Sequence, residues 1–76
     1  KEKLTAFPSP QLYTLAGITL GKMGLYNKAI ESFEAALRID PACTTALYNL
    51  YIAYKKIGLY DKAEAVRKKL KLCNLG

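Results

Sequence analysis

Histidine and tryptophan are absent from the 76 residues, and cysteine occurs only at Cys43 and Cys73. Zinc sites use about four ligands at short spacings, whereas these two cysteines lie far apart with no His to join them. We therefore expect no metal ion and no cofactor. Buried or half-buried thiols are the expected state of both cysteines, because Cys commonly takes such positions. A disulfide is the alternative, and it would favour an extracytoplasmic setting.

The chain also lacks a long apolar run. Its longest stretch without a charged residue, residues 4–21, is interrupted by Pro8, Ser9, Pro10 and Gln11, which argues against a membrane span. No initiator Met and no charged-then-apolar leader begins the sequence, so we expect it to come from inside a longer protein. The compartment is not fixed by these features, although the cytoplasm fits them better than an extracellular location.

Acidic residues are few, six against 12 Lys and Arg, and the excess positive charge lies in one region. Residues 55–71 contain seven of the 12 bases and two of the six acids. Any electrostatic attraction for nucleic acid, an anionic lipid surface or an acidic peptide therefore resides in the last third of the chain. The basic face expected there consists of Arg67, Lys68, Lys69 and Lys71.

One hexapeptide occurs twice. Residues 24–29, Gly-Leu-Tyr-Asn-Lys-Ala, return 34 positions later as residues 58–63, Gly-Leu-Tyr-Asp-Lys-Ala. Gly suits the left-handed residue that ends a helix, and Asn27 or Asp61 suits the N-cap of the next one. Asp61 with Glu64 three residues later also fits a capping box. Each copy therefore predicts a turn between two helices, and the fixed period indicates a stacked helical repeat.

Helical periodicity and helix breakers predict four helices, at residues 10–23, 27–40, 44–57 and 61–74. Ser9 and Pro10 favour the first start, Pro41 ends the second helix, and Thr44 or Thr45 is the expected cap of the third. The buried stripe expected on the first helix consists of Tyr13, Ala16, Gly17 and Leu20. Since no strand-like alternation occurs, the expected fold is all-α, an α-solenoid of two antiparallel helical hairpins.

These residues resemble the tetratricopeptide repeat, a helix–turn–helix unit of the same period. The first repeat follows the family pattern at Tyr13, Ala16, Gly17, Leu20, Ala29, Phe33, Ala36 and Pro41. Small residues such as Gly17 and Ala29 let helix backbones approach, and Phe33 fills the space between them. The expected domains are an N-terminal extension or the tail of an upstream element at 1–9, a first repeat at 10–43 and a second at 44–76.

The second repeat follows the pattern less well. Its first helix conforms at Leu47, Leu50 and Tyr54. Tyr51 stands where a small residue is usual, Arg67 replaces the aromatic residue, Leu70 replaces Ala, and no Pro follows. We interpret the second repeat as degenerate in its second helix, which suggests that this helix packs against something other than a standard third repeat.

The resemblance implies a scaffold for protein–protein interaction, in which the first helices of successive repeats line a concave groove for a peptide or a helix. By helical spacing, the groove residues expected here are Gln11, Thr14, Ile18, Lys22, Thr45, Tyr48, Asn49, Ile52, Lys55 and Lys56. Their mixture of aromatic, aliphatic and positive side chains predicts a partner segment with apolar and acidic residues. The open alternative is that Tyr48 and Ile52 pack against a neighbouring repeat that these residues do not include.

Two other classes of function have less support. The bases of the fourth helix could neutralise phosphates of nucleic acid or of an anionic surface, but no aromatic platform or recognition-helix pattern accompanies them. Catalysis is not expected, because the acids fit helix caps and surface positions and no Gly-rich phosphate loop follows a strand.

Self-association is a further expectation. A solenoid normally needs about three repeats to bury a continuous core, and two repeats leave two open ends. The apolar residues left to be buried at the C-terminal end are Val66, Leu70, Leu72, Cys73 and Leu75. We expect packing between copies through the terminal helices, or docking of residues 1–7 over one end. The sequence gives neither the identity of the partner nor the number of repeats.

Overall fold

The computed structural model describes residues 9–75, which form four α-helices and no strand. The helices are α1 (Pro10–Lys22), α2 (Tyr26–Ile39), α3 (Thr44–Lys56) and α4 (Tyr60–Leu75). Each begins and ends within one residue of the expected bounds, so the all-α prediction is confirmed. Residues 1–8 of the expected N-terminal extension lie outside the described part of the chain.

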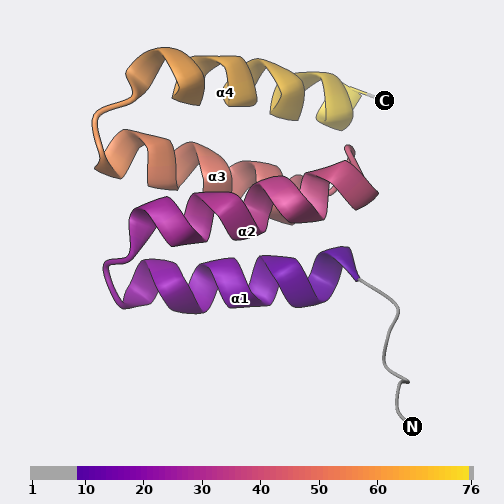
Figure 1. The fold of residues 1–76 in the computed structure, drawn as a ribbon. Coiled ribbons are helices and arrows are strands. Elements are labelled where there is room, and N and C mark those ends of the chain that lie inside the picture. The colour runs from indigo at the N-terminus through magenta and orange to yellow at the C-terminus, as the bar shows by residue number, and fades with distance from the viewer. Residues whose placement is uncertain (1–8, 76) are drawn as a thin grey trace, which may run out of the picture.

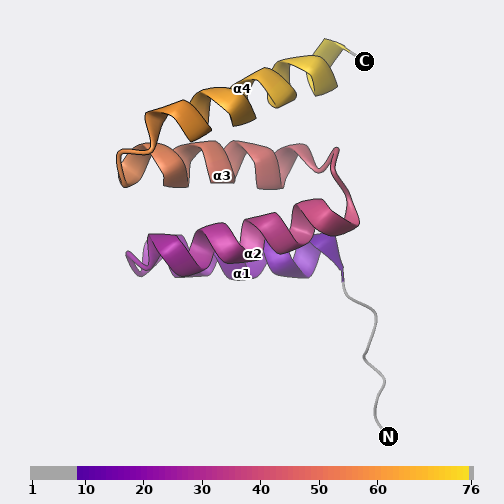
Figure 2. The same cartoon turned by 45° about the horizontal axis from the view of Figure 1, so that its top comes forward.

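The helices stack as two antiparallel hairpins, with both hairpin turns at the same end of the stack (Figure 1). α1 packs against α2 and α3 against α4, and α3 also packs against α2 and α1. Within residues 9–75, α1 and α4 do not pack together. The fold is therefore an open α-solenoid and not a closed four-helix bundle. Figure 2 shows α4 diverging from α3 towards its C-terminal end.

The first turn ends α1 at a left-handed glycine. Gly24 has a φ of 81°, its N–H donates to the carbonyl of Gly21 at 3.0 Å, and the N–H of Leu25 donates to the carbonyl of Leu20 at 2.9 Å. These two bonds form the Schellman motif. The carbonyl of Leu25 then accepts from the N–H of Ala29 at 2.9 Å, so one residue both closes α1 and opens α2.

The second turn repeats this geometry bond for bond. Gly58 has a φ of 83° and donates to the carbonyl of Lys55 at 3.2 Å, while the N–H of Leu59 donates to the carbonyl of Tyr54 at 2.9 Å. The carbonyl of Leu59 accepts from the N–H of Ala63 at 3.0 Å. The duplicated hexapeptide therefore encodes the same turn twice, as expected.

The expected N-caps of α2 and α4 are wrong. Leu25 is the N-cap of α2, without a side-chain cap bond, and Asn27 already lies inside the helix. Asp61 likewise lies within the first turn of α4, and the Glu64 carboxylate binds Arg67 instead of completing a capping box. The physical reason is that the Schellman motif ends one helix and starts the next at the same residue, two positions before the polar side chain.

Of the other two expected N-caps, one is confirmed and one is wrong. Ser9 caps α1 as expected, since its hydroxyl accepts from the N–H of Leu12 at 3.4 Å. The N-cap of α3 is Cys43, without a side-chain cap bond, and not Thr44 or Thr45. The α3 start is thus fixed by backbone bonding, because the carbonyl of Cys43 accepts the N–H of Leu47 at 3.0 Å.

One apolar cluster joins the two hairpins. Its buried members are Ala29, Ile30, Phe33, Leu47, Leu50, Ala53, Tyr54, Ala63 and Val66. Two residues of the stripe expected on α1 lie outside it, because Tyr13 is 37% exposed and Ala16 is exposed. Their counterparts in the second repeat, Leu47 and Leu50, are buried. The difference arises because α3 has a preceding hairpin to pack on, whereas no described residue covers this side of α1.

Gly17 sets the closest approach within the first hairpin. A Cβ atom at this position would lie 2.5–2.8 Å from three atoms of the Phe33 ring, well inside the ordinary separation of non-bonded carbons. At Gly21, one turn further along α1, a Cβ atom would meet nothing within 4 Å. The small residue at Gly17 is therefore required by the packing of α1 on α2.

We expect Gly17→Leu to lower the free energy of unfolding by about 1–3 kcal/mol, because the larger side chain overpacks the contact with Phe33. Gly21→Ala is the matched control in the same helix. Its methyl group enters open space, and a helix-interior Gly→Ala change stabilises by about 0.5–1 kcal/mol. Urea denaturation followed by circular dichroism measures both variants. An unchanged midpoint for Gly17→Leu would mean that the Phe33 ring moves aside without cost.

Candidate functional site

A groove runs between α1 and α3, the first helices of the two hairpins. Two hollows that share Ile18 make up this groove, one of about 220 Å³ and one of about 400 Å³. Eight of the ten expected groove residues line them, namely Gln11, Thr14, Ile18, Lys22, Thr45, Asn49, Ile52 and Lys56. The structure therefore brings most of the expected residues to one surface.

The groove has an apolar middle and a basic end. Ile18 and Ile52, which occupy equivalent positions of the two repeats, are half-buried in the smaller hollow. Lys22 and Lys56, a second equivalent pair, line the same hollow and are exposed. These four side chains line one hollow because α1 and α3 occupy equivalent positions of the two repeats and run in the same direction (Figure 1).

Two polar residues of the groove are occupied by local hydrogen bonds. Thr14 is only 4% exposed, and its hydroxyl donates to the carbonyl of Pro10 at 2.7 Å. The Asn49 amide donates to the carbonyl of Thr45 at 2.8 Å. A Thr that bonds the carbonyl one turn earlier satisfies the donor of its own hydroxyl, and because Thr14 is also buried it contributes to the wall of the groove.

Tyr48 and Lys55, the remaining two expected residues, do not line the hollows between α1 and α3. They line a separate hollow of about 470 Å³ together with Tyr51, Ile52, Lys56 and Tyr60. The expected ridge of Tyr48, Ile52 and Lys55 thus separates two hollows, with Ile52 shared by both. Sequence reasoning missed Tyr51 and Tyr60, although Tyr60 occupies in the second repeat the position of Tyr26, which lines the first groove.

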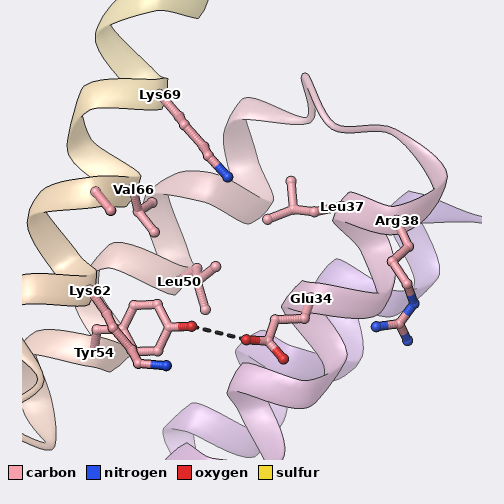
Figure 3. A pocket seen from close by; sticks show the side chains of 9 residues that line it. Glu34, Leu37, Arg38, Leu50, Tyr54, Lys62, Val66 and Lys69 are labelled. Carbon is pink, nitrogen blue, oxygen red and sulfur yellow. Dashed lines mark hydrogen bonds between the residues drawn. The ribbon is translucent and has the colours of Figure 1, made fainter.

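A third surface lies on the back of the stack, between α2 and α4 (Figure 3). This back hollow has a volume of about 380 Å³ and is lined by Glu34, Arg38, Tyr54, Lys62 and Lys69 with apolar neighbours. The Tyr54 hydroxyl donates to Glu34 Oε2 at 2.9 Å, which ties α3 to α2 of the preceding hairpin. Burial, and then the hydrogen bond to Glu34, raise the pKa of Tyr54 to about 12.

Residues 10–43 match the family model of the tetratricopeptide repeat. This segment is a tetratricopeptide repeat. No curated protein matches the chain. Tetratricopeptide repeats typically serve as scaffolds in protein–protein interaction, and the match supports a general role of this kind. The two small residues expected to permit close helix packing in this repeat, Gly17 and Ala29, are both buried.

The four basic residues expected to form a face on α4 have different surroundings. Arg67 holds the Glu64 carboxylate through three contacts of 2.9–3.2 Å. This hydrogen bonding lowers the pKa of Glu64 and raises that of Arg67. Lys69 lines the back hollow, whereas Lys68 and Lys71 are exposed and line none of the hollows described above. Lys68 and Lys71 also lower the pKa of Glu64 through their charges, so they lie on the same side of α4 as Arg67, and the basic face stays a prediction.

Both cysteines are free and half-buried, as expected for the thiol state. Cys43 Sγ lies 3.8 Å from the Thr14 hydroxyl oxygen. Within residues 9–75 no group of three or more His, Cys, Asp or Glu side chains is placed to hold a metal ion. None of the described helices is long and apolar enough to span a bilayer.

We expect Tyr54→Phe to lower the free energy of unfolding by about 1 kcal/mol near neutral pH, because the bond to Glu34 is lost. The raised pKa fixes the sign of the pH dependence. The unfolded chain loses the phenol proton near pH 10, before the folded chain does at about 12, so the contribution of Tyr54 is complete below pH 10 and is lost as the pH rises towards 12.

The test compares urea unfolding of the wild type and Tyr54→Phe from neutral pH to about pH 11. The stability difference should shrink as the pH passes about 10. Tyr60→Phe removes a hydroxyl from a tyrosine that is 63% exposed and serves as the control, with little change expected at neutral pH. A constant difference between wild type and Tyr54→Phe across this range would contradict the assignment.

Proposed function

We propose that the groove between α1 and α3 holds a peptide segment of a partner protein, with an apolar side chain over Ile18 and Ile52 and a carboxylate at Lys22 and Lys56. In this proposal the chain acts as a scaffold without a catalytic step of its own. The observation that carries the proposal is the pairing of equivalent residues, two isoleucines and then two lysines, around the same hollow.

Charge supports an acidic ligand. Among the described residues that line the groove there is no Asp or Glu, so the two ammonium groups have no carboxylate partner within it. Apolar contact at the middle supplies affinity and the charges supply orientation, as in other peptide-recognition grooves. Affinity should be weak, because two repeats offer a small interface and exposed ion pairs contribute little.

Fluorescence anisotropy with two synthetic peptides tests the proposal. One carries a central Leu followed by three Glu, and the other has Gln in place of each Glu. We expect the Glu peptide to bind more tightly, and Lys22→Glu to lower its affinity by about tenfold, since a favourable charge contact of roughly 0.7 kcal/mol becomes a repulsion of similar size.

Lys28→Glu is the matched control for this experiment, because Lys28 is exposed on α2 and lines none of the described hollows. It makes the same change in net charge at a site outside the groove. Equal losses of affinity for Lys22→Glu and Lys28→Glu would show that the effect comes from net charge alone. Equal affinity for the two peptides would show that the lysines do not bind the carboxylates of the ligand.

Self-association is a second proposal, through the rear face of α1, which we define as Leu12, Tyr13 and Ala16. Leu12 is 64% exposed, and with Ser9 these residues line a hollow of about 320 Å³. Their counterparts in the second repeat are Ala46, Leu47 and Leu50, all buried against the first hairpin. The rear face is thus equivalent to a surface that already packs on a hairpin, and an uncharged patch can pair with itself across a two-fold axis.

We expect the wild-type chain to form a dimer at about 1 mM, where mass action favours association, and sedimentation velocity to detect it. Leu12→Glu should abolish this dimer. Leu72→Glu, at an exposed residue of the other terminal helix, should leave dimer formation unchanged. A wild-type chain that stays monomeric at this concentration, or an equal effect of Leu72→Glu, would show that the rear face of α1 is not the contact.

A further inference from the structure

The back hollow is the space that remains between the second helices of the two hairpins. Within residues 9–75, α2 and α4 do not pack together, so the hollow opens between them above α3 (Figure 3). Nine residues of α2, α3 and α4 line it, and its volume is about 380 Å³. Sites for small molecules are commonly hollows of about 300–1,000 Å³, and positions between helices are typical for them. The size and place of the back hollow therefore suit a small ligand.

The floor of the back hollow is apolar and fixed in place. Leu50 is 4% exposed and Val66 is 6% exposed, and both belong to the core cluster, against which Leu37 packs. These three side chains come from three different helices and lie together between α2 and α4 (Figure 3). Since core packing holds the floor before any ligand arrives, an apolar body that covers it removes apolar area from water without ordering the site first.

Basic side chains surround this floor from both sides. Lys62 and Lys69 extend from α4 towards α2, and Arg38 lies on α2 (Figure 3). All three are exposed, and within residues 9–75 none of them forms an ion pair. The two lysines are seven residues apart, which corresponds to about 10.5 Å along a helix, so the positive charge spans the hollow.

One acid lines the back hollow, and a hydrogen bond already occupies it. Glu34 Oε2 accepts from the Tyr54 hydroxyl at 2.9 Å, and the pKa of Tyr54, raised to about 12, keeps that donor protonated near neutral pH. Three bases and one acid give the lining residues a formal charge of +2. The hollow therefore favours a ligand with two negative charges.

Two of the three bases are not part of the repeat pattern. The residue one repeat after Arg38 is Leu72, and the residue one repeat before Lys69 is Ala35. Lys62, in contrast, has Lys28 as its counterpart. The charge of the back hollow thus arises where the two repeats differ, and the shared helix–turn–helix architecture does not account for it.

Other occupants agree less well with the back hollow. A stable protein–protein interface involves about 20–30 residues on each side, whereas nine line this hollow. A nucleic-acid strand needs exposed aromatic side chains for base stacking, but the one aromatic residue among those that line the hollow, Tyr54, is 7% exposed.

We propose that the back hollow binds a small organic dianion, with an apolar body on Leu37, Leu50 and Val66 and a phosphate group or paired carboxylates between Arg38 and Lys69. A guanidinium group suits both anions, because it binds their oxygens in a bidentate way. The site shares no lining residue with the groove between α1 and α3. A ligand held here contacts both hairpins and ties α4 to α2.

The test titrates the ¹⁵N-labelled chain near neutral pH with four probes. Phenyl phosphate and benzylsuccinate carry an apolar body and two charges, whereas inorganic phosphate lacks the body and benzyl alcohol lacks the charge. The first two should give saturable shifts of the amide signals of Leu37, Val66 and Lys69, with those of Ile18 and Lys22 unchanged. The last two should bind at least about tenfold more weakly. Binding by only one of the first two supports the site and identifies its anion as phosphate or dicarboxylate.

Variants at exposed positions test each part of the site and should retain the fold. Arg38→Gln and Lys69→Gln should each weaken binding by about threefold, as the loss of one exposed charge contact does. Lys68→Gln is the matched control, since Lys68 is the exposed neighbour of Lys69 and lines none of the described hollows. Ala65→Phe should abolish binding without a change in charge, because Ala65 is exposed and lines the hollow, and the added ring occupies it.

Several outcomes would overturn the proposal. Inorganic phosphate that binds as tightly as phenyl phosphate would leave only a nonspecific charge effect, and so would an equal loss of affinity for Lys68→Gln and Lys69→Gln. Full binding by Ala65→Phe would place the ligand elsewhere. If the peptide with a central Leu followed by three Glu binds at these amides more tightly than phenyl phosphate, the hollow takes a partner segment instead of a small molecule.

Discussion

The left-handed glycine of each hairpin turn is the constraint on which the rest of the fold depends. The two glycines have φ values of 81° and 83°, in a region that an L side chain enters at a cost of roughly 1 kcal/mol or more. Since the following residue closes one helix and opens the next, each turn sets the phase of both its helices. The two hairpins therefore share one register, and residues one repeat apart take equivalent places, which brings Lys22 and Lys56 to the same hollow.

Helix bounds were predictable because the signals that set them are local. Gly at the left-handed position, Pro near helix ends and the spacing of apolar residues act within a few residues, and the four helices followed them closely. The N-caps were less predictable. Side-chain preference favours Asn27 and Asp61, but the backbone bonds of the Schellman motif leave no linker in which either residue could precede its helix.

The sequence predicted which residues of α3 share a face, but not what lies on each side of α3. Helical spacing predicts that Tyr48, Ile52 and Lys55 lie along one ridge, and all three line one hollow, but spacing does not say which neighbour lies on each side of that ridge. The groove lies on one side, beside α1, and an open surface lies on the other. Thr14 shows a second limit of prediction from helical spacing. Spacing places this polar residue at the surface of the groove, but in the structure it is buried and its hydroxyl donates to the carbonyl of Pro10.

The two outer surfaces of the stack differ in chemistry although the repeats share their backbone geometry. On the rear face of α1, an apolar leucine and tyrosine remain open, and they correspond to residues that are buried in the next repeat. At the opposite end, the positions that are apolar in the first repeat carry Glu64, Arg67 and Lys71. Exposed charges at one end favour water or a charged partner there, whereas the exposed leucine and tyrosine at the other end favour an apolar contact.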